Sequence, residues 1–229
     1  VKIVYELPGV NTEFLSTYTF FGNGVMRIYN TLYPTVYQSD IPRIGMQMQL
    51  QNEFNRVSYF GRGPWENYSD RNSSSFVDLY SQHIEDFYVP YIRPQENGNR
   101  TGVCWMSFSN AENTGLMVVS KAIEGLSINA SHMQREQFDI SSGLDYTPGN
   151  ESVNFSKHTT DIKPEDLIHL NVDLAQRGLG GDDSWYAKPQ DTYLLKGSIA
   201  HSYTFYIIPY QNASLEKLVD LSKNYITID

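Results

Sequence analysis

Short runs in which apolar and polar residues alternate recur along the chain, and they restrict its fold more than any other feature. Alternation at every second position is typical of β-strands with one buried and one solvated face. Clusters of Gly, Asn, Ser and Pro separate the runs, as expected for turns. The candidate strands are residues 17–21, 25–32, 44–50, 54–60, 75–79, 87–92, 101–108, 116–121, 126–130, 168–174 and 197–208.

Only one segment has the pattern of a helix, because Ser214 can cap a helix in which Leu215, Leu218 and Val219 share one face. Ten or more strands must bury their faces against each other, so the sequence predicts an all-β fold, a large antiparallel two-layer β-sandwich with a short C-terminal helix. A βα-barrel is excluded, since it needs a helix after every strand.

The sequence contains no internal repeat and no convincing linker, so residues 1–229 are expected to form a single domain. The sandwich would occupy about residues 1–210, and a helical extension about residues 211–229. The chain does not begin with Met, and we expect it to be a fragment of a longer protein.

The charge of the chain disfavours some partners. A formal net charge of −9 argues against nucleic acid, because binding a phosphate backbone depends on Lys and Arg. No apolar run approaches the ~18 residues of a membrane helix, so no membrane partner is expected. The N-terminus lacks the apolar core of a signal peptide, so no targeting segment is expected and the compartment stays open.

The most distinctive loop is rich in glycine and ends in acidic residues and a tryptophan. Its sequence is Gly178-Leu179-Gly180-Gly181-Asp182-Asp183-Ser184-Trp185. An aromatic ring beside carboxylates suits a sugar, whose apolar face lies on the ring while its hydroxyls donate to the carboxylates. A second interpretation stays open, in which the loop is a tight turn and Trp185 is the first core residue of the next strand.

Two further loops and one histidine are candidates for sugar binding. Residues 94–100 place Glu96, Asn97 and Arg100 near a turn, which suits either sugar hydroxyls or a hairpin tip. His132 ends a strand and can donate to a sugar oxygen or bond to its own neighbours. The charged residues of the loop 61–71 are explained by a structural network of ion pairs and turns.

The sequence itself supplies no complete catalytic apparatus. A glycosidase needs two carboxyls facing each other, about 5–5.5 Å apart for retention or wider for inversion. Adjacent Asp182 and Asp183 do not meet this need, because neighbours in an extended chain point to opposite faces. No two histidines have metal-ligand spacing, although a cation held by backbone carbonyls would leave no sequence signature, so metal binding stays unknown.

Four motifs occur in the order and spacing of the C-terminal, small-chain domain of family 2 glycoside hydrolase β-galactosidases, which this chain resembles over roughly residues 15–210. The motifs are residues 61–71, 88–98, 131–132 and 180–185. The resemblance implies a galactose mutarotase-like supersandwich. It further implies a domain that packs against the other domains of a β-galactosidase, an oligomeric enzyme that hydrolyses terminal β-D-galactosides.

In that family the catalytic glutamates and the magnesium ligands lie on a βα-barrel that this chain does not contain. The resemblance therefore implies no catalytic residue and no cofactor here, with magnesium on the missing barrel, and it expects the fragment alone to be inactive. It assigns Trp185 to the sugar platform that reaches into the barrel's active site. We weigh two alternatives, a free-standing carbohydrate-binding module and a mutarotase-like epimerase, for which no matching catalytic His and Glu are found.

Overall fold

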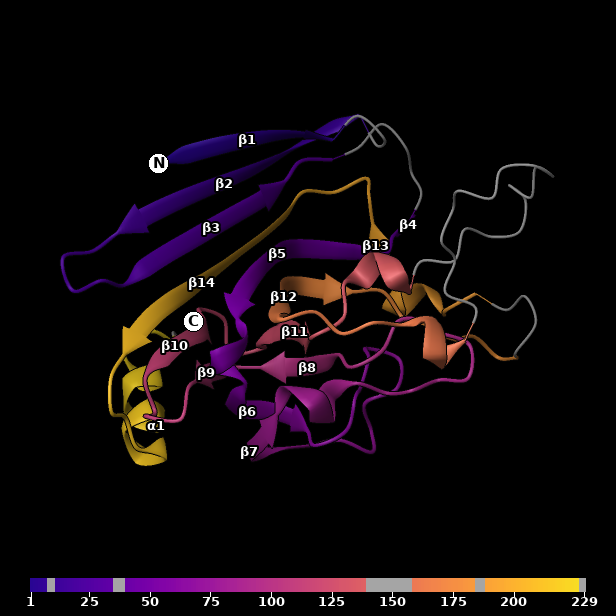
Figure 1. Ribbon diagram of the computed structural model, residues 1–229. Helices are drawn as coiled ribbons and strands as arrows, with labels where there is room; N and C mark the ends of the chain where they lie inside the picture. The colour runs from indigo at the N-terminus through magenta and orange to yellow at the C-terminus, as the bar shows by residue number, and fades with distance from the viewer. Residues whose placement is uncertain (8–10, 35–39, 139–157, 184–187, 227–229) are drawn as a thin grey trace, which may run out of the picture.

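The chain folds into two packed β-sheets, as the alternating pattern predicts (Figure 1). The computed structural model describes residues 1–7, 11–34, 40–138, 158–183 and 188–226. The large sheet has the strand order β1 (Lys2–Leu7), β2 (Thr12–Phe20), β3 (Met26–Leu32), β14 (His201–Tyr210), β10 (Gly115–Ser120), β9 (Trp105–Ser109), β6 (Arg56–Gly63) and β7 (Phe76–His83).

The second sheet is smaller and lies beside the first. Its order is β5 (Arg43–Gln51), β12 (Leu167–Gln176), β11 (Leu126–Ser131) and β8 (Arg100–Val103). A short pair, β4 (Asp40–Ile41) and β13 (Leu195–Lys196), precedes β5 and β14 respectively. The pairings are antiparallel in each sheet, which confirms the predicted antiparallel sandwich.

The large sheet is covered on both faces near its middle, and β10 shows how its sequence achieves this. Val118 packs into the core between the two sheets, together with Phe205 of β14. Its neighbours Met117 and Val119 point the opposite way and pack with Leu218 of α1 (Leu215–Lys223). Because successive side chains of a strand face opposite sides, a continuous apolar run here serves two cores.

The C-terminal helix forms where its sequence predicts. Ser214 Oγ accepts a hydrogen bond from the Lys217 N–H at 3.3 Å and so caps the first turn of α1. Figure 1 shows α1 beside the ends of β14 and β10. In the described part of the chain, no helix has both the length and the apolar content needed to cross a membrane.

The predicted strand 101–108 is partly wrong, because the chain changes sheets within it. β8 pairs with β11 in the small sheet, whereas β9 pairs with β6 and β10 in the large one. Cys104 lies between them, donating its N–H to Phe60 and accepting from Ser120. Gly102, with φ +62°, lies in β8 where its register against β11 shifts. Cys104 is buried, and burial raises the pKa of its thiol.

The predicted strand 87–92 does not form. Residues Ile84–Phe87 make a 3-10 turn, and the chain then runs without strand pairing to β8. Pro90 cannot donate to a ladder, and the Val89 N–H bonds instead to the side chain of Asn97. Within the described ranges, four further 3-10 turns occupy Asn52–Phe54, Arg135–Gln137, Thr159–Asp161 and Asp191–Tyr193.

Candidate functional site

The glycine segment, defined as residues 178–183, follows β12 and is fixed to two distant parts of the chain. The Gly178 N–H donates to the carbonyl of Tyr193 at 2.8 Å. The Gly180 N–H donates to Asp70 Oδ2 at 2.9 Å. The loop that the sequence singled out is therefore tied both to the turn before β13 and to the loop 61–71.

A cavity of about 570 Å³ lies against the glycine segment. This volume falls within the range of roughly 300–1,000 Å³ that small-molecule sites occupy. The lining residues are Asp70, Arg71, Tyr91, Gln95, Glu96, Leu179, Gly180, Gly181, Asp182, Gln190 and Tyr193. Carboxylates and amides beside tyrosine rings are groups that bind hydroxyls and the apolar face of a sugar. The fold thus brings the predicted residues Glu96 and Asp182 to one cavity.

A second cavity, of about 470 Å³, lies between β5 and the strands β1 to β3. Its lining is mainly apolar and includes Phe14, Leu32, Ile44 and Met46. Sugar hydroxyls left without partners in such surroundings would lose their hydrogen bonds to water. The polar cavity beside the glycine segment is therefore the better candidate for a sugar.

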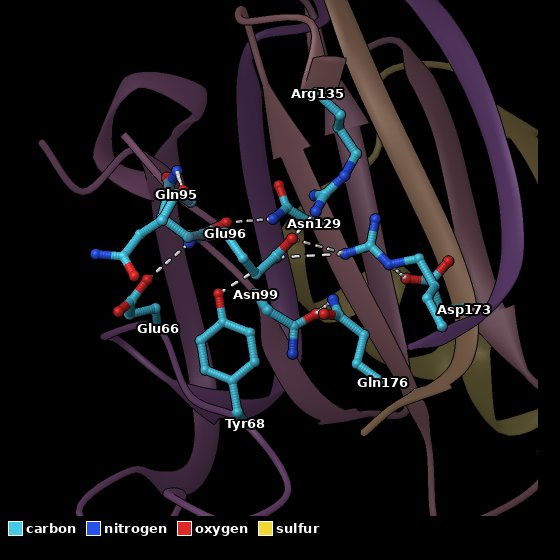
Figure 2. A network of polar contacts seen from close by, with 12 residues as sticks. Glu66, Tyr68, Gln95, Glu96, Asn99, Asn129, Arg135, Asp173 and Gln176 are labelled. Carbon is cyan, nitrogen blue, oxygen red and sulfur yellow. Dashed lines mark hydrogen bonds and ion pairs between the residues drawn. The ribbon is translucent and has the colours of Figure 1, made fainter. Parts of the chain in front are cut away.

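Glu96 occupies the centre of a polar network at the first cavity (Figure 2). Arg43 Nη2 lies 3.3 Å from Glu96 Oε1, Arg135 pairs with Glu96 Oε2, and the Tyr68 hydroxyl donates to Oε1 at 3.3 Å. Figure 2 shows Tyr68 and Arg135 converging on this carboxylate. Two guanidinium groups balance its charge, so Glu96 is suited to accept hydrogen bonds and not to donate a proton.

The network continues into the small sheet through Arg43, whose Nε lies 3.0 Å from Oδ2 of Asp173. Asp173 is fully buried, and its carboxyl fills the space that Gly45 on the neighbouring strand leaves free. Burial raises the pKa of Asp173 to about 7, although Arg43 and Arg135 act in the opposite direction. The site thus rests on an internal carboxyl that titrates near neutral pH.

The loop 61–71 contains the ion pair and turn contacts that the sequence predicts. Glu66 pairs with Arg71 at 2.7 Å and accepts the Gly98 N–H at 2.8 Å. The Tyr91 hydroxyl also donates to Glu66. These contacts join the two motif loops on one side of the cavity, and Arg71 and Tyr91 also form part of its lining.

Two predicted sugar ligands, Asn97 and His132, are not among the described residues that line the cavity. The Asn97 side chain accepts from the Val89 N–H at 3.2 Å and donates to the Gln95 carbonyl at 2.9 Å. His132 Nδ1 lies 2.9 Å from the Leu167 carbonyl. The geometry gives both residues structural roles, and sugar binding by either stays a prediction.

Arg100 was expected at the sugar as well, and the structure buries it in the interior instead, with 1% of its surface exposed. Its guanidinium carbon lies 4.2 Å from the centre of the Phe87 ring, and its Nη1 donates to the Gly98 carbonyl at 3.0 Å. Burial lowers the pKa of Arg100. Arg100 is not among the described residues that line the cavity, and sugar binding by it stays a prediction.

Trp185 lies outside the described residues, and its predicted role as a sugar platform is untested. Asp183 is described and exposed next to Asp182. The sequence does not predict that Gln190 and Tyr193 line the cavity, because they lie beyond the glycine segment and belong to no recognisable motif.

Metal binding receives no support from side-chain clusters. Among the described residues, no group of three or more His, Cys, Asp or Glu side chains is placed to hold an ion. This finding does not test where the magnesium expected from the resemblance would bind.

Comparison with known proteins places the chain in a family. The family described as "Beta galactosidase small chain" matches residues 1–207. A beta-galactosidase of Priestia megaterium is 32% identical over 193 residues, which cover 84% of this chain and 17% of that protein. A beta-galactosidase of Streptococcus thermophilus is 26% identical over 212 residues, or 91% of this chain and 19% of that protein.

A third relative, the beta-galactosidase of Leuconostoc mesenteroides, is 31% identical over 182 residues, which are 80% of this chain and 15% of the relative. The chain therefore spans less than a fifth of the length of each of these three relatives. The match over residues 1–207 includes every loop that lines the polar cavity, and the chain belongs to the beta-galactosidase small chain family.

Proposed function

We propose that this chain is the non-catalytic, C-terminal part of a β-galactosidase, and that its glycine segment completes a galactoside site whose catalytic residues lie on a βα-barrel elsewhere in the polypeptide. The observation that carries the proposal is the polar cavity beside that segment, which contains Glu96 and Asp182. Each of the three relatives named above is called a beta-galactosidase, and each is much longer than the matched part.

The chemistry of the cavity supports binding and not bond cleavage. A glycosidase needs one carboxyl that donates a proton and a second that acts from the opposite side of the sugar. Here Glu96 is held by two arginines and a tyrosine, and Asp70 accepts the Gly180 N–H. These carboxylates serve as hydrogen-bond acceptors, and Asp182 on the exposed rim of the cavity can accept from a sugar hydroxyl.

The 229-residue chain alone is expected to leave a chromogenic β-galactoside intact. The physical reason is that Glu96 and Asp70 are engaged as acceptors, so neither is placed to donate a proton opposite a nucleophile. The measurement is the hydrolysis rate beside that of a Trp185→Ala chain. A wild-type rate clearly above this control would contradict the proposal. Galactose titration, followed by tryptophan fluorescence, tests the alternative: appreciable binding by the isolated chain would favour a free-standing module.

In the complete polypeptide, replacing Trp185 with alanine is expected to raise KM for the galactoside about tenfold and to change kcat less. The sugar would lose an aromatic platform while the acid and nucleophile stay in place. Steady-state kinetics give both constants.

Trp65→Ala is the matched control, because Trp65 is 73% exposed and is not among the described residues that line the cavity. Unchanged kinetics in the Trp185 variant, or equal losses in the two variants, would contradict the proposed role.

A further inference from the structure

A hydrogen bond between the exposed part of the glycine segment and a side chain holds the segment at the cavity. Residues 179–183 are exposed, and Gly180 donates its N–H to Asp70 Oδ2 at 2.9 Å. A hydrogen bond to a carboxylate is stronger than one between neutral groups. Asp70 therefore holds the rim of the cavity from a loop that is 110 positions away in the sequence.

Gly178 has a packing requirement at the same carboxylate. A Cβ at this position would lie 2.7 Å from Asp70 Oδ2, closer than real Cβ atoms approach another heavy atom, and 3.0 Å from Tyr193 Cβ, which is a tight contact. At Gly180 a Cβ would lie 3.8 Å from the same oxygen, an ordinary contact. The Asp70 carboxylate thus occupies the space that the missing side chain of residue 178 leaves open.

The other end of this contact lies in a hydrogen-bonded turn. Asp70 lies in a tight turn in which Tyr68 and Arg71 form a β-bridge, with the Arg71 N–H donating to the Tyr68 carbonyl at 2.9 Å. The Arg71 guanidinium lies 4.9 Å from the centre of the Tyr68 ring and pairs with Glu66. A side chain that is positioned in this way loses little conformational entropy when it bonds to the segment.

We propose that Asp70 is a positioning residue that fixes the glycine segment at the cavity, so that Asp182 faces the sugar. The fixing itself rests only on the Asp70–Gly180 contact and the packing at Gly178. That Asp182 faces a sugar rests on the proposed function. Asp70 acts through the backbone of the segment and takes no part in chemistry.

Amide hydrogen exchange, measured by NMR on the 229-residue chain, tests the fixing directly. Asp70→Ala removes the acceptor, and the protection factor at residue 180 is expected to fall about tenfold, the effect of losing one charge-assisted hydrogen bond. Asp70→Asn keeps an oxygen in reach and should retain most of the protection. Gly178→Ala displaces the carboxylate and is expected to lower protection as Asp70→Ala does, although both partners remain.

Gly180→Ala is the matched control, because it adds the same methyl group two positions along and keeps the N–H. Its protection factor is expected to stay within about twofold of the wild type, since the new Cβ meets only an ordinary contact. If Asp70→Ala prevents folding, Gly178→Ala decides the question. Unchanged protection in Asp70→Ala, or in Gly178→Ala where only that variant folds, overturns the proposal.

Kinetics of the complete polypeptide separate this proposal from the proposed function. Asp70→Ala should raise KM for a β-galactoside about three- to tenfold with kcat largely kept, and Asp70→Asn should restore it. Lower protection together with an unchanged KM leaves the fixing by Asp70 intact and overturns the sugar role of the segment. A fall in kcat with KM unchanged overturns the positioning role at the sugar.

Discussion

The Asp173→Asn variant is expected to become more stable relative to the wild type as the pH rises from about 4 to 7. The measured quantity is the difference between their free energies of unfolding. The folded protein holds the Asp173 carboxyl with a pKa of about 7, because burial disfavours its charge. The unfolded chain ionises it near its ordinary pKa of about 3.9. Below that pH both states are protonated, and the wild type has the full benefit of a neutral carboxyl.

Between these two pKa values, the unfolded state loses the proton while the folded state keeps it. The stability that Asp173 contributes therefore falls by about 1.4 kcal/mol per pH unit, or about 4 kcal/mol in all, and is constant above pH 7. The asparagine side chain of the variant has no proton to lose, so the difference in unfolding free energy between variant and wild type should grow across this range. Urea unfolding at pH 4, 5, 6, 7 and 8 measures it.

Asp220→Asn is the matched control, because the Asp220 side chain is 75% exposed on α1. The difference in unfolding free energy between Asp220→Asn and the wild type should show no comparable rise from pH 4 to 7. The charged groups that face Asp173 are Arg43 of β5 and Arg135, and both keep their charge throughout this range. If the difference in unfolding free energy between Asp173→Asn and the wild type does not change with pH, the buried carboxyl is already ionised near pH 4, because the two arginines stabilise its charge.

Most of the fold could be predicted from the sequence because a two-residue period survives any tertiary context in which one face is buried. Residues 46–50 show this, since Gln47 and Gln49 are exposed while the even positions pack against the core in β5. The period could not show that the chain changes sheets at Cys104, because the apolar run 103–106 continues across the corner without a break. The predicted strand 87–92 rests on its apolar residues and leaves out of account Pro90, which has no N–H to donate to a ladder.

The site was predictable where a loop has an unusual composition, as in the glycine segment. It was not predictable where the function depends on which side chains meet through space. Glu96 and Arg100 belong to one short segment, and the sequence treats them alike. The fold directs Glu96 to the cavity and Arg100 into the interior, since β8 begins at Arg100 and pairs there with β11, whereas Glu96 lies in the unpaired stretch before the strand.

Arg100→Ala is accordingly expected to cost about 3–5 kcal/mol of stability, the range for removing a large buried side chain. The side chain is 1% exposed and packs on the Phe87 ring, so its loss leaves a cavity and an unpartnered Gly98 carbonyl. Arg100→Met keeps the length and apolar stem, and replacing a buried charge by an apolar group of similar size is often nearly neutral. It should recover most of the loss in urea unfolding.

Arg27 provides the matched pair of controls, because it lies exposed on β3 and its replacement changes the net charge equally. Arg27→Ala and Arg27→Met should both unfold close to the wild type. If Arg100→Met is as unstable as Arg100→Ala, the guanidinium charge stabilises the interior, and volume does not decide the result. If instead Arg100→Ala is nearly as stable as the wild type, the Arg100 side chain is not packed as described. That result would favour its predicted role in sugar binding.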